Sequence, residues 1–479
     1  MGQKRGKVIW PMLLATVMML SACSSAPATS SVTNSANNGG TTDQPAAATN
    51  SAAEATADPA AGGSADTAAN AANELPSKDI TGEVTVWAFN ETVFDEIGAA
   101  FMAEYPGIKL NTVVMPFGDL HDKLQTTIAA GSGAPDVAEV EMYQLNRYMA
   151  GHVLENLLEE PYNAGKYKDL VHPFNWERWM TPDSSELLGM PWDMTPGVYY
   201  YRADIFEELG LPSDPTELGE YMQDEENFLN LVQILKANGK YFMEWSDGPI
   251  VWAGDEVGYF DKDMNWLRNT EKMVKVLDIT KRGQQLGWAP HLGYTTDEGK
   301  QLVLKGDLVG VVSGSFGARG LQETFPELAG KWKATRLPVG INVGMGGSSF
   351  VIPAQSKNKE AAWAYIQWSM RSENAWKIWT KHSIQPGYKD IASLDWYANT
   401  KNEYLGGQEE FKLYEQLSND IPIKHLTPVD NKGWEIFITA IGDALAKNTD
   451  SKTVIQKIGD DVMAQASKEI AAFKQAMQE

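Results

Sequence analysis

The sequence predicts an α/β fold for the body of the chain, which begins near residue 80. Short apolar runs with strand-like alternation are followed by longer stretches in which apolar residues recur every three or four positions, as in helices. Over residues 82–151 these patterns follow the order β-α-β-α-β-α, which indicates a parallel sheet covered by helices. The roughly 400 residues of this body allow two or three domain-sized units.

Three strands and three helices are expected in the first unit. The strands are predicted at residues 82–90, at 108–115 and from Asp136 onward. The helices are predicted from apolar residues that share one face, which are Val93, Phe94, Ile97 and Phe101, then Leu120, Leu124 and Ile128, then Leu145 and Tyr148. Ligands of parallel sheets bind beyond the carboxyl ends of the strands. These ends are predicted at Phe89-Asn90 and at Glu139 to Glu141.

A second unit begins with a strand at residues 197–201, which contains Tyr199, Tyr200 and Tyr201 in succession. Paired tyrosines can bind ferric iron, but successive side chains of a strand point to opposite faces, so the pattern favours core packing. A further buried strand is predicted at 308–315. Helices are predicted at 202–209, around 228–235, at 271–287, 297–307, 360–369, 434–446 and 454–477.

The N-terminus has the features of an export signal. Three basic residues precede an apolar run at 8–20, which is too short to span a bilayer. The run ends in Leu20-Ser21-Ala22-Cys23, which resembles the bacterial lipobox, and Cys23 is the only cysteine of the chain. We therefore expect residues 1–22 to be a lipoprotein signal peptide and Cys23 to be acylated, anchoring the protein to the membrane. The alternative is a plain secretory signal with a chance cysteine.

Residues 24–78 differ in composition from the rest of the chain. They are rich in Ala, Ser, Thr, Asn and Gly, and they contain no aromatic residue. Such a stretch buries too little apolar area to offset the entropy of ordering, so it is predicted to be a flexible tether behind Cys23. A marginal Ala-rich helix is the alternative, which the Asn, Gly and Pro residues disfavour.

Composition and motifs exclude several functions. The net charge of −23 at pH 7 argues against nucleic-acid binding. No zinc-ligand spacing, phosphate-binding loop or nucleophile elbow occurs, so neither a metal nor a cofactor is expected. Residues 261–265 resemble the start of a calcium-binding loop, but Trp266 and Lys272 replace the required Gly and Glu. This segment is predicted to be a hairpin turn.

Three stretches together resemble a known family. They are the opening unit with YPGIKL and IAAGSGAPDV, the segment MPWDMTPGVYYYRADIFEELGL, and KGDLVGVVSGSFGARGL followed by LPVGINVGMGGSSFVIPAQ. Their order and spacing resemble family 1 of the bacterial extracellular solute-binding proteins, which includes the maltose- and multiple-sugar-binding lipoproteins of ABC importers. No single stretch is decisive, but with the lipobox the resemblance covers nearly the whole chain.

The resemblance implies a clamp of type II with two α/β lobes and a hinge between them. Lobe 1 is expected at residues 80–192 plus 338–385, and lobe 2 at 193–337 plus 386–479. The implied protein is a monomer outside the cytoplasm that captures a mono- or oligosaccharide and delivers it to the transmembrane subunits of an ABC permease. It is not expected to be an enzyme.

Aromatic faces and carboxylates at strand ends are the groups expected to bind a sugar, because rings cover its C–H patches and carboxylates accept its hydroxyl hydrogens. The candidates are Phe89, Asn90, Glu141, Trp192, Asp193, Trp252, Ser315, Phe316, Gly347, Tyr388 and Trp434. Glu139 and Trp245 are further possibilities.

Each candidate also has a structural interpretation. Trp192-Asp193 can be a turn tryptophan and a helix cap, Asn90 can also cap a helix, and Phe316 can be buried in a Gly-rich turn. Glu139 and Glu141 can be solvated, the segment 344–349 can be a hinge turn, and the remaining aromatic residues can belong to the core.

Two other functions remain open at this stage. The same clamp could bind a peptide, a polyamine or iron instead of a sugar. An extracellular glycosidase would need two carboxylates about 5–9 Å apart across one site, a distance that the sequence does not give.

Overall fold

The computed structural model describes residues 74–89 and 91–476. The predicted signal peptide, Cys23, the tether up to residue 73 and Asn90 lie outside the described residues. In the described part, no helix combines the length and the apolar character needed to cross a membrane.

The first sheet has five strands in the order β2-β1-β3-β8-β4. Its strands are β1 (Gly82–Ala88), β2 (Ile108–Val114), β3 (Val137–Glu141), β4 (Met190–Pro191) and β8 (Ser348–Val351). β1 pairs in parallel with β2 and β3, which confirms the parallel arrangement predicted for the first three strands. β8 pairs antiparallel with β3 and β4, so the complete sheet is mixed. The resemblance implied that residues 338–385 return to lobe 1, but the sequence analysis did not predict the strand β8 or its antiparallel pairing.

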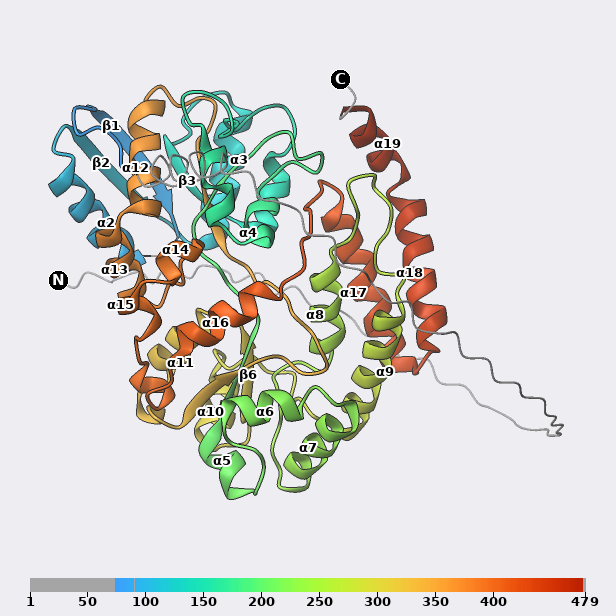
Figure 1. The fold of residues 1–479 in the computed structure, drawn as a ribbon. Helices are drawn as coiled ribbons and strands as arrows, with labels where there is room; N and C mark the ends of the chain where they lie inside the picture. The colour runs from blue at the N-terminus through green and yellow to red at the C-terminus, as the bar shows by residue number, and fades with distance from the viewer. Residues whose placement is uncertain (1–73, 90, 477–479) are drawn as a thin grey trace, which may run out of the picture. The chain divides into compact units, whose positions relative to one another are not determined.

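Helices pack against this sheet from two distant parts of the chain. α2 (Glu91–Glu104) lies between β1 and β2 in sequence, and α12 (Lys359–Arg371) and α13 (Glu373–Lys381) come after β8. Both α2 and α12 contact the sheet, and α13 contacts α2 (Figure 1). We name the sheet and the apolar core around it lobe 1; this core draws its residues from 84–194 and 350–391, together with two residues near 421–426.

The chain between β3 and β4 contains only short elements. α3 (Phe117–Ala129) precedes β3, and the helix predicted around Leu145 and Tyr148 is present as the 3₁₀ helix η1 (Met142–Tyr148). The short elements η2 (Ala164–Leu170) and α4 (Pro173–Glu177) follow. The sequence analysis assigned no element to residues 152–189, because no long periodic pattern occurs there.

The second sheet has three strands in the order β6-β5-β7, and both pairs are antiparallel. The strands are β5 (Val198–Arg202), β6 (Gly310–Ser313) and β7 (Trp332–Thr335). The rings of Tyr199 and Tyr201 stack in one core, while Tyr200 lies in a second core on the other face. The prediction that the three tyrosines pack in cores on opposite faces is therefore confirmed.

We name this sheet and the two cores around it lobe 2. Its helices before β7 are α5 (Ala203–Glu208), α6 (Pro215–Tyr221), α7 (Glu225–Ala237), α8 (Gly248–Val257), α9 (Glu271–Leu286), α10 (Asp297–Leu304) and α11 (Gly317–Thr324), with η3 (Pro326–Leu328) after them. The segment at 261–265 is a hairpin turn, as predicted, because the carboxylate of Asp261 accepts hydrogen bonds from the backbone N–H groups of Asp263 and Asn265.

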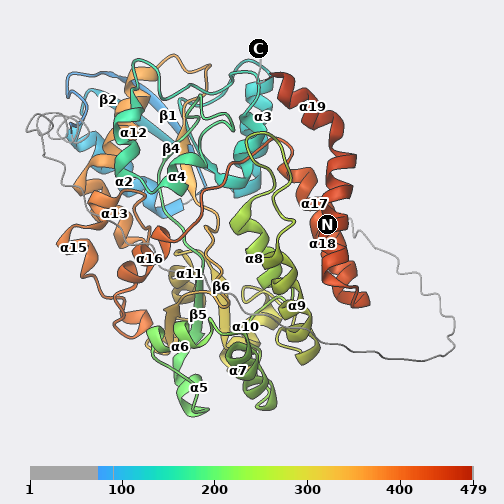
Figure 2. The same cartoon turned by 45° about the vertical axis from the view of Figure 1, so that its right-hand side comes forward.

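The C-terminal helices complete lobe 2, except that Ile391 in the first of them belongs to the core of lobe 1. They are α14 (Lys389–Ala392), α15 (Asp395–Ala398), η4 (Glu403–Leu405), α16 (Glu410–Asn419), α17 (Asp430–Lys447), α18 (Ser451–Gln465) and α19 (Ser467–Ala476). Figures 1 and 2 show α17 and α18 beside α8 and α9, and α18 contacts α9. The single helix predicted at 454–477 is wrong, since the backbone of the buried Ala466 leaves helical geometry and divides it.

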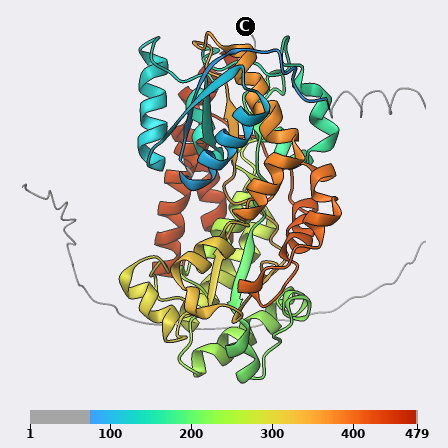
Figure 3. The same ribbon diagram turned by 90° about the vertical axis from the view of Figure 1, so that its left-hand side faces the viewer.

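Three segments run between the lobes near residues 193–197, 343–347 and 384–388. Asp193 bridges to Pro386, and Pro196 bridges to Gly344, so the segments are joined side by side. Figure 3 shows the blue strands of lobe 1 above β5, drawn in green. The boundaries predicted for the lobes stay a prediction.

Candidate functional site

A cavity of about 590 Å³ lies where the two lobes meet, and we name it the main cavity. Lobe 1 supplies residues that follow β1, residues at the end of β3 and residues just after it, and lobe 2 supplies residues at the start of α11. The crossing segments supply the rest. The lining residues are Phe89, Phe117, Glu139, Glu141, Tyr143, Gln144, Trp192, Asp193, Thr195, Ser315, Phe316, Arg319, Gly346, Gly347, Ser348, Ser383, Ile384 and Gln385.

Three carboxylates face this cavity, and each is held by a backbone N–H group. Glu139 Oε2 accepts from Phe89 N at 3.0 Å, and Glu141 Oε2 accepts from Tyr143 N at 2.8 Å. Asp193 Oδ1 accepts from Ser348 N at 2.6 Å. Burial raises the pKa of Glu139 and of Glu141 to about 8 and also raises the pKa of Asp193. Within the described residues, Glu139 Oε1 is buried and has no hydrogen-bond partner.

The buried side chain of Arg178 lies behind these carboxyl groups and binds the backbone of the cavity wall. Arg178 donates from Nη1 to Gly346 O at 2.8 Å and from Nη2 to Asp193 O at 3.1 Å. Its guanidinium also lies over the rings of Phe174 and Trp179. Burial lowers the pKa of Arg178 to about 10, and the neighbouring Asp193 and Glu141 act in the opposite direction. Arg178 thus ties two of the crossing segments together.

Gly347 is a position where glycine is required. Its φ is +105°, and a Cβ atom there would lie 2.5 Å from Nη2 of Arg178. Gly347 lines the main cavity, and the absence of a side chain allows its backbone to lie against the guanidinium of Arg178.

Aromatic rings border the main cavity from both lobes. Phe89, Phe117 and His121 form a cluster in lobe 1, with centroids 5.1 Å apart for Phe89 and Phe117 and 4.6 Å apart for Phe117 and His121. Phe316 enters from lobe 2 and is 42% exposed. The alternative of a buried Phe316 is therefore wrong. Ser315 lies beside it, and its hydroxyl donates to Met194 O at 3.0 Å.

Trp192 lines the cavity but offers no open ring face. Its side chain is only 1% exposed and packs on Phe94, Phe350 and Trp379. Stacking of a ligand on Trp192 does not fit this packing, so Trp192 supports the wall next to Asp193.

Several candidates lie away from the main cavity. Tyr388 is fully buried, and its hydroxyl donates to Pro191 O at 2.9 Å, so it belongs to the core. Trp252 packs against the core of lobe 2, and Trp245 is exposed; neither lines the main cavity. The expectation that Trp252 and Tyr388 contact a ligand therefore finds no support in their positions.

A second cavity of about 300 Å³ lies on the other side of Tyr143, and we name it the side cavity. Its lining residues are Met142, Tyr143, Asn146, Val251, Asp255, Gly258, Tyr259, Arg268, Lys424, His425, Leu426, Asp430, Asn431 and Trp434. The candidate Trp434 is therefore placed here and not in the main cavity.

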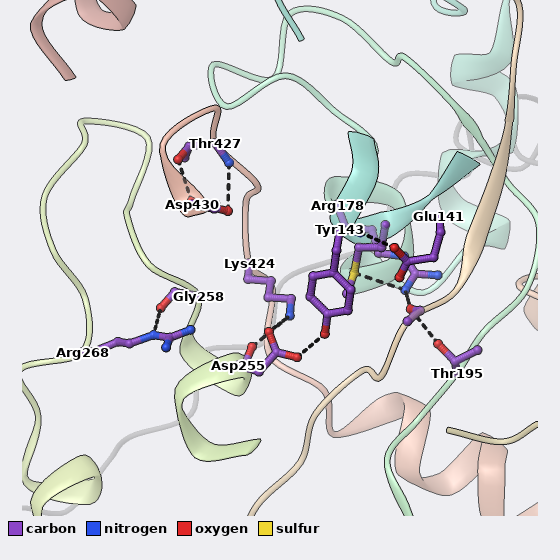
Figure 4. Close-up of polar contacts among 12 residues, drawn as sticks. Glu141, Tyr143, Arg178, Thr195, Asp255, Gly258, Arg268, Lys424, Thr427 and Asp430 are labelled. Atoms are coloured by element: carbon purple, nitrogen blue, oxygen red, sulfur yellow. Dashed lines mark hydrogen bonds and ion pairs between the residues drawn. The ribbon is translucent and has the colours of Figure 1, made fainter. Parts of the chain in front are cut away.

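A polar network joins the lobes at the boundary between the cavities (Figure 4). The hydroxyl of Tyr143, from η1 of lobe 1, donates to the carboxylate of Asp255, from α8 of lobe 2. Lys424 Nζ donates to the other carboxylate oxygen of Asp255 at 2.8 Å and to its backbone O at 2.9 Å. Lys424 is almost fully buried, so its charge depends on Asp255 for compensation.

Sequence reasoning missed the lining residues Phe117, Tyr143, Gln144 and Arg319, and it also missed Arg178, which lies behind the wall of the main cavity. Tyr143 and Gln144 directly follow the end of β3, so extending the strand-end rule by two residues would have found them. The other three lie on helices or on irregular chain, and no local pattern marks them.

Fold and cavity together define a class of protein: two lobes joined by crossing segments, with a solute-sized cavity between them. Residues 88–376 match the bacterial extracellular solute-binding proteins. The chain belongs to this family, a family of binding proteins outside the cytoplasm.

Named relatives agree with this membership. The arabinooligosaccharide-binding protein of Bacillus subtilis (strain 168) is 26% identical over 347 residues, covering 67% of this chain and 77% of the relative. The lactose-binding protein of Rhizobium radiobacter is 23% identical, and the match covers 80% of this chain and 93% of the relative.

The fold also matches solved structures. A sugar-binding protein of Xanthomonas citri has a TM-score of 0.68 at 19% identity, covering 82% of this chain and 100% of that one. A galacto-N-biose-/lacto-N-biose I-binding protein of an ABC transporter from Bifidobacterium longum has a TM-score of 0.66 at 17% identity. The match covers 82% of this chain and 98% of that one. The predicted two-lobed α/β clamp of type II is thus confirmed.

Proposed function

We propose that this protein captures a carbohydrate between its two lobes and delivers it to the transmembrane subunits of an ABC permease. The observation that carries the proposal is the composition of the main cavity. The carboxyl groups of Glu139, Glu141 and Asp193 provide hydrogen-bonding partners for hydroxyl groups, and the exposed rings of Phe117 and Phe316 provide faces for C–H patches.

The distribution of exposed rings supports a hydroxylated ligand over a simple ion. Among the residues described, five aromatic side chains are strongly exposed, and four of them line the two cavities: Phe117, Tyr143, Phe316 and Trp434. Exposed rings gathered in a cleft are costly to hydrate and gain contacts when a sugar covers them. In addition, the described residues contain no cluster of His, Cys, Asp and Glu suited to a metal ion.

The relatives narrow the choice of carbohydrate to be tested. Proteins similar to this chain are named for arabino-oligosaccharides, lactose and lacto-N-biose. We propose a ligand of this kind, bound without chemical change, by a monomer that Cys23 anchors to the membrane through acyl chains.

Calorimetric titration of the purified protein tests the proposal. The panel contains arabinose, arabino-oligosaccharides, lactose, galactobiose and maltose, with spermidine, a tripeptide and ferric citrate as other cargo. Binding of a sugar without release of products supports the proposal. Binding only of a non-sugar solute would show that the cargo is not a carbohydrate. Hydrolysis of a sugar would show that the protein is a glycosidase and not a binding protein.

The anchor is tested separately. Replacing Cys23 by Ser in the producing cell is expected to move the protein from the membrane fraction to the medium or the periplasmic fraction. Retention of the variant in the membrane fraction would contradict the proposed acylation.

A further inference from the structure

A chain of buried polar groups connects helix α16 to the wall of the main cavity. It begins at the carboxyl group of Glu410 and runs through the hydroxyl groups of Tyr414 and Tyr200, all three side chains being almost fully buried. It ends at the backbone carbonyl groups of Gly314 and Ser315. Figures 1 and 2 show α16 beside α11, and Ser315, just before α11, lines the main cavity.

Each link of this chain has the length of a hydrogen bond. Tyr414 Oη lies 2.9 Å from Glu410 Oε2 and 2.8 Å from Tyr200 Oη. Tyr200 Oη lies 3.1 Å from the carbonyl oxygen of Gly314 and 3.1 Å from that of Ser315. Since each tyrosine hydroxyl has a single hydrogen to donate, the donors of the chain can all point only one way at a time.

The amide of Asn402 determines where a proton on Glu410 is held. Asn402 Nδ2 donates to Glu410 Oε1 at 2.8 Å, and Asn402 Oδ1 accepts from the backbone N–H groups of Tyr404 and Leu405. Because both ends of this amide are engaged, Oε1 of Glu410 stays an acceptor. A proton on the carboxyl group therefore lies on Oε2, the oxygen that faces Tyr414.

The ionisation of Glu410 sets the direction of the chain. Ionised Glu410 accepts the hydrogen of Tyr414, and the short contact between the two hydroxyl oxygens is then favourable only if Tyr200 donates to Tyr414. In this state Tyr200 has no hydrogen left for the carbonyl groups of Gly314 and Ser315. Protonated Glu410 instead donates to Tyr414, which donates to Tyr200. The hydrogen of Tyr200 then goes to a carbonyl group of the cavity wall.

The surroundings of Glu410 place this change in the neutral pH range. Burial raises the pKa of Glu410 to about 7, and the hydrogen bonds from Asn402 and Tyr414 act in the opposite direction. The titratable side chains that face it are Tyr414 of its own helix, Tyr200 of β5 and Tyr397 of α15. Burial raises the pKa of each tyrosine well above its usual value, so all three stay neutral while Glu410 titrates.

The neighbouring acids of this segment are engaged elsewhere. Glu409 pairs with Lys412 at 2.7 Å, and Glu415 Oε1 lies 3.0 Å from His172 Nε2. Glu410 can therefore be changed without breaking either of these pairs.

We propose that Glu410 is a positioning residue for ligand binding, which acts through the two tyrosine hydroxyl groups on the wall segment 314–316. When Glu410 is protonated, the chain donates a hydrogen bond to this segment, and when it is ionised, that bond is lost. Phe316, which enters the main cavity from the same segment, is then held less firmly. This inference rests on the proposed function and adds a control of affinity by pH that originates outside the cavity.

A pH titration of the protein without ligand tests the chain itself. NMR follows the backbone amide signals of Ser315 and Phe316 from pH 5 to pH 9, because each amide nitrogen is bonded to one of the two carbonyl groups. Wild type and the control Glu409→Gln should show a transition at about pH 7. Glu410→Gln should lack this transition, since its amide has no ionisable proton. Tyr414→Phe should lack it too, because it interrupts the chain and leaves Glu410 in place.

Calorimetric titration with lactose, galactobiose, maltose and arabinotriose measures the consequence for binding. At pH 5.5 wild type and Glu410→Gln should bind alike. At pH 8.5 Glu410→Gln should bind about threefold more tightly than wild type, because the glutamine amide still donates to Tyr414. Comparing the two proteins at one pH cancels the titration of Glu139, Glu141 and Asp193, which both contain.

Two results would overturn the inference. One is a transition of equal size in wild type and Glu410→Gln, or none in wild type. The other is equal affinity of the two proteins at pH 8.5, and in both cases the proposed function would still stand. Binding of none of the four sugars by wild type at either pH would contradict the proposed function and, with it, the role of Glu410 in binding.

Discussion

The hydroxyl group of Tyr143 in lobe 1 donates a hydrogen bond to the carboxylate of Asp255 in lobe 2. The two residues are 112 positions apart in the sequence, and Lys424 adds an ion pair of 2.8 Å to the same carboxylate. This contact joins the lobes directly, apart from the crossing segments. It therefore stabilises the arrangement in which both lobes reach the ligand.

Tyr143→Phe is expected to weaken ligand binding about tenfold. A hydrogen bond to a charged group contributes about 1.5–3 kcal/mol, and tenfold in affinity corresponds to about 1.4 kcal/mol. Loss of the bond makes the arrangement in which the two lobes touch at Tyr143 less stable, and it raises the apparent dissociation constant accordingly. Calorimetric titration with the sugar that binds the wild-type protein measures the change, and Tyr221→Phe, on α6 of lobe 2, is the control.

A double-mutant cycle separates this contact from other effects of the substitution. Asp255→Ala in the Tyr143→Phe background should add less than it does alone, because both variants remove the same hydrogen bond. Strict additivity, or an unchanged affinity in Tyr143→Phe, would show that this bond does not contribute to ligand binding.

Phe316→Ala is expected to lower affinity about fivefold, which corresponds to roughly 1 kcal/mol of ring contact. The melting temperature without ligand should change little, because the ring is strongly exposed. Leu304→Ala, an equally exposed apolar residue outside both cavities, is the control. An unchanged affinity in Phe316→Ala would remove this ring from the site.

The buried carboxyl group of Glu139 predicts a dependence of stability on pH. Its pKa is about 8 in the folded protein and near 4.5 in the unfolded chain. Between these values the folded protein holds a proton that the unfolded chain has released, so the free energy of unfolding falls as the pH rises from about 4.5 to 8. The full effect on the free energy of unfolding is on the order of 5 kcal/mol.

Glu139→Gln should reduce this decline, because the amide keeps an acceptor for Phe89 N and carries no ionisable proton. Thermal unfolding between pH 5 and pH 8.5 measures it, with the exposed Glu83→Gln as the control. Glu141 contributes in the same direction, so a shallower slope is expected and not a flat one. An identical slope in wild type and Glu139→Gln would contradict the assignment.

Gly347→Ala is expected to destabilise the fold by about 2 kcal/mol or more and to weaken binding, since the Cβ atom meets Arg178 and the backbone has positive φ. Gly340→Ala is a matched control, because its φ is +71° and no atom lies within 4 Å of the added Cβ. Chemical denaturation of both variants separates the clash from the backbone strain. Equal losses in the two variants would mean that Arg178 moves away without cost.

The sequence contained enough information for the local elements and for many site residues. Period-two runs located β1, β2 and β3, and the rule that ligands bind at strand ends led to Phe89, Glu139 and Glu141. The resemblance to the family added Asp193, Ser315, Phe316 and Gly347, all of which line the main cavity.

Contacts between distant segments were not predictable in this way. β4 has two residues and β8 has four, so neither shows a period, and β8 joins the first sheet more than 200 residues after β3. The bond between Lys424 and Asp255 joins positions 169 apart, and Arg178 is set by backbone carbonyl groups that no pattern reveals. The sequence analysis expected Trp192 to contact the ligand, because its position in the sequence does not show that Phe350 and Trp379 cover its ring.

The most direct test of carbohydrate capture is calorimetric titration of the purified protein with arabino-oligosaccharides, lactose, galactobiose and maltose, with the sugars analysed for cleavage afterwards. The predicted result is saturable binding of at least one of them, unchanged in structure, together with weakened binding in Tyr143→Phe and Phe316→Ala. No binding of any sugar by a folded protein, or cleavage of a bound sugar, would contradict the proposed function.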